Sequence, residues 1–153
     1  MSKLQVNQNI NDATYWVSIE RAILSSILFD YDLMESINDK LIPAMFYHPA
    51  HKVIFETMQN LYREGMPIDE SFLRTRIDTK AVDDSILIEI MTVNAITNVE
   101  AYIQDMIEIH TKREIISIAT LIKKSSFVSY DSDHYFFLKN SKDICERIEN
   151  GIL

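Results

Sequence analysis

The chain has 153 residues, of which 47% are hydrophobic, with two glycines, three prolines and a formal net charge of −8. This length fits one domain with its own core, and the scarcity of glycine and proline together with the high apolar content disfavours turn-rich sheet folds and collagen-like or disordered classes. The negative charge argues against strong direct binding of nucleic acid, because such binding neutralises phosphates with Lys and Arg.

The sequence predicts neither a membrane segment nor a disulfide. No stretch approaches the roughly 18 uncharged apolar residues that a membrane span needs, and the N-terminus lacks the apolar core of a signal peptide. Cys145 is the single cysteine, so no internal disulfide can form, in keeping with a reducing compartment. We therefore expect a cytoplasmic protein without a membrane partner.

The first predicted helix follows a polar arm. Residues 1–11 lack apolar periodicity, and we expect them to form a mobile arm. A helix is predicted over residues 13–29, with Asp12 as its cap. A short helix follows over residues 33–40, until Pro43 interrupts it. The apolar residues that give the first helix its spacing are Trp16, Ile19, Ala22, Ile23, Leu24 and Ile27.

The best-marked helix starts at Pro49 and ends before Gly65. Proline suits a first helical turn, and glycine can take the left-handed conformation that closes a helix. Pro67 prevents the helix from resuming at once, and Asp69 offers a cap for the next short helix, which runs to Ile77. The face expected to be buried comprises Val53, Ile54, Met58, Leu61 and Tyr62.

Two more helices are expected before the C-terminal part. Residues 85–91 are too continuously apolar for periodicity to separate helix from strand, and the lack of a strand partner favours a helix. Thr97 and Glu100 have capping-box spacing, with Thr97 as the cap. The helix that follows is about thirty residues long and continues until the polar turn at residues 129–133, so it either kinks near residues 111–113 or projects beyond the globule.

Residues 112–153 are predicted to form a helical hairpin, with a polar turn at 129–133 and a second helix over 134–150. The charge changes at the same place: residues 1–111 hold 8 basic and 17 acidic side chains, whereas residues 112–153 hold 7 and 6. The predicted fold is all-α, a small orthogonal, globular bundle of about six helices over residues 12–111 with an appended antiparallel hairpin.

The hairpin is the expected interface. Two helices bury only part of their apolar surface, so exposed apolar residues there indicate a partner. Two basic pairs, at 112–113 and 123–124, fit an acidic protein neighbour better than nucleic acid, because the aromatic residues gather at the turn and do not alternate with them. The residues expected to form the self-association or partner surface are Ile118, Ile122, Phe127, Tyr130, Tyr135, Phe136, Phe137 and Ile148.

No catalytic apparatus is recognisable. Two glycines far apart in the sequence exclude a phosphate loop, a dinucleotide fingerprint and a serine-nucleophile elbow. His48 and His51 lack the HExxH spacing and a third ligand, so a capping or packing role is expected for them. His110 and His134 are isolated and are expected at the surface. We therefore predict no catalytic, cofactor-binding or metal-binding residue.

A set of spaced residues runs from the first helix to the hairpin: Glu20, Leu24, Leu28, Asp30, Phe46, Tyr47, His51, Ile54, Phe55, Leu61, Gly65, Pro67, Ile68, Asp69, Asn98, Tyr102 and Arg113. In combination, over roughly residues 18–150, this order resembles the N-terminal domain of bacterial replicative DNA helicases, the DnaB family. Ser25 departs from the pattern, since many members have a glycine there, and the first helix is expected to pack slightly differently as a result.

The resemblance implies a non-catalytic scaffold of a hexameric helicase. Hairpins of neighbouring subunits would pair, the globules would form a collar above the motor ring, and this tier would dock primase and, in some systems, a helicase loader. The family's ATPase motor, with its ATP and Mg, would follow the hairpin, so we expect a fragment that ends at Leu153 without the motor and holds no cofactor.

Two alternatives stay open. One is the helicase-binding C-terminal domain of a primase, which is similar in combining a helical globule with a hairpin. That domain would follow a catalytic core, whereas here a polar arm beginning at Met1 precedes the first helix. The other is a small helical metalloenzyme that uses His48 and His51.

Overall fold

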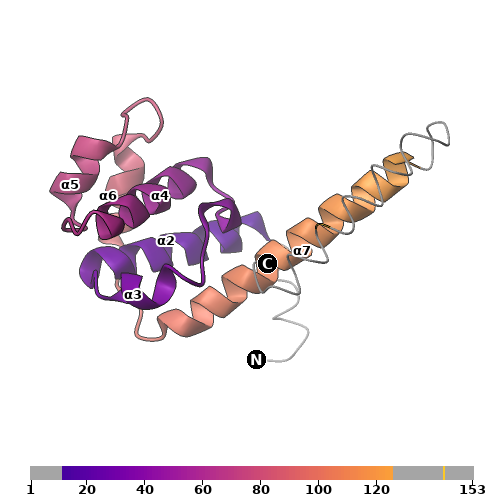
Figure 1. The fold of residues 1–153 in the computed structure, drawn as a ribbon, viewed down its shortest axis with the longest axis horizontal. Helices are drawn as coiled ribbons and strands as arrows, with labels where there is room; N and C mark the ends of the chain where they lie inside the picture. The colour runs from indigo at the N-terminus through magenta and orange to yellow at the C-terminus, as the bar shows by residue number, and fades with distance from the viewer. Residues whose placement is uncertain (1–11, 126–142, 144–153) are drawn as a thin grey trace. The chain divides into compact units, whose positions relative to one another are not determined.

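The computed structural model describes residues 12–125 and Asp143. Within them every regular element is a helix (Figure 1), so the predicted all-α class is confirmed for this part of the chain. Apart from Asp143, the second helix of the predicted hairpin lies outside the described residues. The elements are α2 (Ala13–Phe29), α3 (Leu33–Ile37), the 3-10 turn η1 (Pro43–Met45), α4 (Pro49–Arg63), α5 (Glu70–Arg76), α6 (Asp84–Thr92) and α7 (Val99–Ser125).

The chain divides into two compact units, Met1–Ile107 and Glu108–Leu153. The first unit contains α2 to α6 and the beginning of α7, and the second contains the rest of α7. The limits predicted from the sequence for arm, globule and hairpin stay a prediction. The helices of residues 12–125 are all too short or too polar to span a bilayer.

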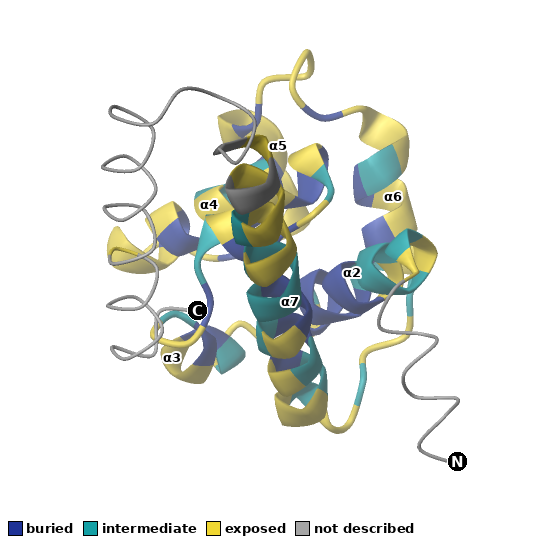
Figure 2. Ribbon diagram, turned by 90° about the vertical axis from the view of Figure 1, so that its right-hand side faces the viewer, coloured by how far each residue is buried: buried dark blue, intermediate teal, exposed yellow. Residues whose placement is uncertain are grey.

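Helix α2 is the central helix of the first unit. It packs against α3, α4 and α6, and its residues 22–27 are all buried (Figure 2, dark blue). A helix surrounded in this way is apolar on most of its faces. Asp12 caps it, because its Oδ1 accepts a hydrogen bond of 2.9 Å from the Thr14 N–H. Both predicted limits of this helix are confirmed.

Two serines on α2 bind the segment between α6 and α7. The Ser25 hydroxyl donates to the Val93 carbonyl at 2.8 Å. The Ser26 hydroxyl donates to the Ala22 carbonyl at 2.8 Å and accepts from the Ile96 N–H at 3.3 Å. The hydroxyls of Ser25 and Ser26 therefore hold this segment against α2.

Helix α4 begins and ends where its sequence predicts. His48 is its N-cap, and the Nδ1 atom accepts from the Ala50 N–H at 3.2 Å. Pro49 occupies the first turn, where it removes no intrahelical hydrogen bond. Gly65, just after the helix, has a φ of 66°, in the left-handed region that residues with a Cβ rarely adopt. The predicted start and end of this helix are confirmed.

The buried face of α4 differs in part from the prediction, and Val53 is only half-buried. Tyr62 is 37% exposed, whereas His51, Phe55 and Gln59 are almost fully buried beside Ile54, Met58 and Leu61. Counting apolar residues alone missed His51 and Gln59, because their polar groups are satisfied by hydrogen bonds inside the core. The prediction that Tyr62 is buried is therefore wrong.

Asp69 caps α5, since its Oδ1 accepts from the Phe72 N–H at 2.9 Å. Its predicted role is confirmed. The ambiguous apolar run at 85–91 lies in the helix α6, with Leu87 and Ile90 buried, so the expected helix is also confirmed.

The start of α7 corrects a prediction. Asn98, and not Thr97, is the cap, because its Oδ1 accepts from the Ala101 N–H at 3.2 Å. Glu100 does not reach back to Thr97, since its carboxylate contacts the Lys40 Nζ at 2.7 Å. Asn caps a helix at least as well as Thr, and the Lys40 ion pair occupies the Glu100 carboxylate that a capping box would need.

His110 was expected at the surface, but its side chain is only 2% exposed. An isolated histidine gives no periodic signal by itself. It lies four residues after Met106 and seven after Ile103, both of which are buried on α7, and these spacings place it on the same helical face. The surface prediction for His110 is therefore wrong. His134 lies outside the described residues.

Candidate functional site

Three residues of the motif set meet where α2 contacts the start of α4. The Glu20 carboxylate accepts hydrogen bonds from the backbone N–H groups of Tyr47 and His48, and the His51 Nδ1 lies 2.8 Å from its Oε2. The side chains of Glu20 and His51 are almost completely buried. A buried carboxylate needs such donors, and it also lies at the N-terminal end of α4, where the helix dipole favours negative charge. This cluster fastens two helices of the core.

His48 adjoins this cluster and caps α4. Burial lowers the pKa of His48, and the His51 ring, whose centroid is 4.6 Å away, lowers it further. A neutral His48 can accept the hydrogen bond from Ala50 that caps α4. Across residues 12–125 and Asp143, no three His, Cys, Asp or Glu side chains are grouped so as to hold a metal ion. The expected capping and packing roles of the two histidines are confirmed.

The other motif residues lie at element boundaries and on α7. Phe46 is buried and stacks on Phe55 with 4.7 Å between ring centroids. Gly65, Pro67 and Asp69 form the turn between α4 and α5. Asn98 caps α7 and Tyr102 lies half-buried on its first turns, whereas Arg113 is half-buried in the second unit.

The predicted self-association surface is described only in part. Ile118 is half-buried on α7, and Ile122 also belongs to α7. The six others lie outside the described residues: Phe127, Tyr130, Tyr135, Phe136, Phe137 and Ile148. Within α7, Ile115 is 52% and Ile116 is 60% exposed. The surface predicted from the sequence includes neither residue. Adjacent residues of a helix point in different directions, so a narrow buried face cannot cover two consecutive isoleucines.

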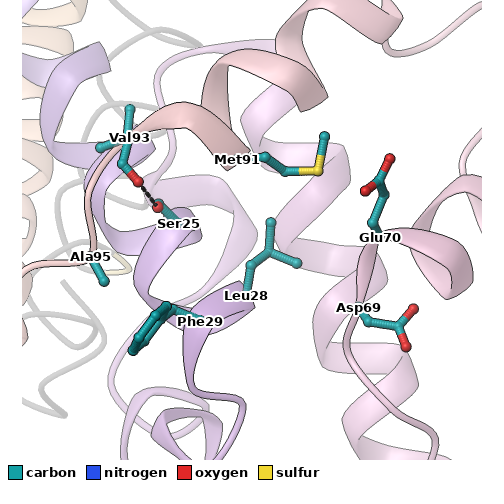
Figure 3. A pocket seen from close by; sticks show the side chains of 8 residues that line it. All are labelled: Ser25, Leu28, Phe29, Asp69, Glu70, Met91, Val93 and Ala95. Carbon is teal, nitrogen blue, oxygen red and sulfur yellow. Dashed lines mark hydrogen bonds between the residues drawn. The ribbon is translucent and has the colours of Figure 1, made fainter.

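A second surface, which the sequence did not indicate, lies on the first unit. One hollow of about 250 Å³ has Leu28 and Met91 at its middle, with Phe29 on one side and the carboxylates of Asp69 and Glu70 on the other (Figure 3). Its lining is completed by Ser25, Val93 and Ala95. A second hollow, of about 460 Å³, is lined by Tyr31, Asp32, Glu35, Tyr62, Gly65, Met66, Pro67 and Ile68.

The amino-acid sequence matches a known family over most of the first unit. The family model described as "DnaB-like helicase N terminal domain" matches residues 12–108. Two curated relatives, each named Replicative DNA helicase DnaB, come from Helicobacter pylori strains J99 and 26695. They are 29% and 31% identical over 136 residues, which covers 88% of this chain and 26% of each relative. The chain therefore spans about a quarter of their length.

Solved structures agree with this match. The N-terminal domain of DnaB helicase from Helicobacter pylori, described with its interactions with primase, superposes with a TM-score of 0.70 at 28% identity, over 84% of this chain and 100% of that chain. The corresponding domain from Mycobacterium tuberculosis gives 0.72 at 19% identity, over 84% and 96% of the two chains, which supports the fold alone. The chain belongs to the DnaB-like helicase N-terminal domain family, as its motif residues predicted.

Proposed function

We propose that this chain is the non-catalytic N-terminal scaffold of a hexameric replicative DNA helicase, and that it pairs subunits into a collar and docks primase during DNA replication. The observation that carries the proposal is the likeness to the Helicobacter pylori domain, whose structure is described with its interactions with primase. The match covers 100% of that domain and 84% of this chain. A helicase loader is a further partner in this proposal. The family favours this role over a primase domain or a metalloenzyme.

We assign ATP and Mg binding to the remainder of the helicase and no cofactor to this chain. A phosphate-binding loop needs several closely spaced glycines followed by Lys and Ser or Thr. The only glycines here are Gly65 and Gly151, and Gly65 serves to close α4. The net charge of −8 also supports a scaffold that contacts proteins and does not bind DNA strongly. A cytoplasmic location is consistent with this role.

Subunit pairing is assigned to residues 112–153. Aromatic residues are enriched at protein interfaces, and this segment contains Phe127, Phe136 and Phe137. Ile115 and Ile116 on α7 belong to the same segment and are exposed, so they are further apolar side chains that a partner subunit can cover. A well-buried aromatic side chain contributes about 1–3 kcal/mol to such an interface.

The experiment is light scattering on the purified chain and on a Phe136→Asp, Phe137→Asp double variant. We expect the chain to have the mass of a dimer or larger assembly and the variant to have a lower mass. The control is Ile88→Asp, which places the same charge on a side chain that is 47% exposed on α6 and should leave the mass unchanged. An unchanged mass for the double variant would overturn the assignment of pairing to the hairpin.

A further inference from the structure

We propose that these two hollows of the first unit, lined by residues of α2, α3 and the turn between α4 and α5, form one docking groove for a basic segment of a partner protein, in which large apolar side chains alternate with Lys or Arg. The acidic groove, as we call it, comprises Leu28, Phe29, Tyr31, Asp32, Glu35, Tyr62, Met66, Ile68, Asp69, Glu70 and Met91. It lies within Met1–Ile107, and so it is separate in sequence from the hairpin to which pairing is assigned.

Neighbouring residues of the chain line the two hollows. Ile68 lines one and Asp69 lines the other, and consecutive Cα atoms are about 3.8 Å apart. Phe29 and Tyr31, two residues apart at the end of α2, likewise line one hollow each. A single extended or helical segment can therefore place side chains in both hollows at once.

The groove gathers most of the exposed large apolar side chains of the first unit. Phe29 is 82% exposed, Tyr31 60%, Tyr62 37% and Met66 36%, and these are four of the six such residues described there. Scattered exposed apolar residues are ordinary, but a cluster of aromatic residues and methionine around concave surface is typical of a protein-docking site. The occupant is therefore expected to bring apolar side chains.

The charged side chains that line the groove indicate the charge of the segment that binds there. All four charged side chains in the two linings are carboxylates: Asp32, Glu35, Asp69 and Glu70. Glu70 is paired with Arg74 at 2.8 Å, and Asp69 caps α5.

The other two carboxylates are available to a partner. Among the residues that the structure describes, Asp32 and Glu35 form no ion pair. Carboxylates beside apolar surface attract Lys and Arg and repel phosphates, so charge complementarity favours a basic protein segment over nucleic acid.

The test is a binding titration of the intact chain with a fluorescein-labelled amphipathic peptide made of lysine and leucine, followed by anisotropy. Two groove variants are compared, Phe29→Ser and the double variant Asp32→Asn, Glu35→Gln. Because these side chains are exposed, both variants should fold normally, which circular dichroism checks. We expect each variant to weaken peptide binding about tenfold. Phe29→Ser removes one apolar anchor of the interface, and the double variant removes the two carboxylates that attract the lysines of the peptide.

Two control variants make the same kinds of substitution on the first unit, but outside the acidic groove. Ile88→Ser removes an exposed apolar side chain, and the double variant Asp39→Asn, Glu56→Gln removes two exposed carboxylates outside the groove. Both should change the affinity by less than about twofold. Added salt should weaken the wild-type complex more than the complex of the Asp32→Asn, Glu35→Gln variant, because less charge attraction remains to be screened.

Three results would overturn the proposal. Equal losses in groove and control variants would mean that the peptide binds the acidic surface without selecting the groove. If a peptide with glutamate in place of lysine bound as tightly as the lysine peptide, the carboxylates of the groove would not select a basic segment. A lower mass for Phe29→Ser in light scattering would show that a second copy of the chain occupies the groove. None of these outcomes depends on primase docking, so the two proposals can fail separately.

Discussion

The Nδ1 atom of His51 on α4 lies 2.8 Å from the Oε2 atom of Glu20 on α2, and the two side chains are only 2% and 3% exposed. The carboxylate also accepts from the backbone N–H groups of Tyr47 and His48. Three donors therefore surround one buried carboxylate, which offsets the cost of removing it from water. This arrangement explains in physical terms why a glutamate and a histidine stand at these positions of the motif set.

Glu20→Ala should lower the free energy of unfolding by about 3 kcal/mol, because two backbone N–H groups and His51 would lose their buried acceptor. Urea denaturation followed by circular dichroism measures this. Glu56→Ala, which removes an exposed glutamate on α4, should cost less than about 0.5 kcal/mol. If the two variants were equally stable, the Glu20 cluster would not hold α2 to α4.

The cap of α7 can be tested by a pair of adjacent variants. Asn98→Ala should lose about 1 kcal/mol of stability because the Ala101 N–H would lose its acceptor, whereas Thr97→Ala should change stability by only a few tenths of a kcal/mol. Thermal and urea denaturation of the two variants make the comparison. The reverse order would restore Thr97 as the cap.

Gly65→Ala should cost about 1–2 kcal/mol for backbone reasons alone. A Cβ added at this position meets nothing within 4 Å, so the cost comes from the left-handed conformation at a φ of 66°. Gly65→Asn should lose less, because Asn adopts this conformation more readily. Equal losses for the two variants in urea denaturation would point to a steric cause.

Tyr15 should make the stability depend on pH in the alkaline range. Burial, followed by the hydrogen bond of 3.0 Å that its hydroxyl donates to Asp105, raises the pKa of Tyr15 to about 12. The folded state thus holds this proton more tightly than the unfolded state. Its contribution to stability is complete below about pH 10 and is lost as the pH rises from about 10 to 12.

Spectrophotometric titration of tyrosinate checks this while circular dichroism shows that the chain remains folded. Tyr15 of the wild-type chain should ionise near pH 12, and Tyr15→Phe should remove this transition. If Tyr15→Phe instead removed a transition near pH 10, the partly buried hydrogen bond to Asp105 would not exist in solution.

The local chemistry of single residues predicted much of the fold. Asp12, Asp69 and Gly65 mark helix ends by their own side chains or backbone, so their roles could be predicted without any knowledge of packing. Tyr62 and His110 were misplaced because burial depends on what lies opposite a helix face, and polar groups can be satisfied in a core.

The candidate sites were harder to predict. The acidic groove escaped notice because Phe29, Tyr31, Tyr62 and Met66 come from two separate segments that only the tertiary fold brings together. The hairpin aromatics could be proposed as a surface because they are close in sequence, but all five of them lie outside the described residues.

The most direct measurement is an isothermal titration of the cognate primase into this chain by itself. If the chain is the docking scaffold, primase should bind saturably, with an affinity close to that for the complete helicase, and the mixture should hydrolyse no ATP. A primase that binds the complete helicase but gives no binding heat and no co-elution with this chain would contradict the proposed function.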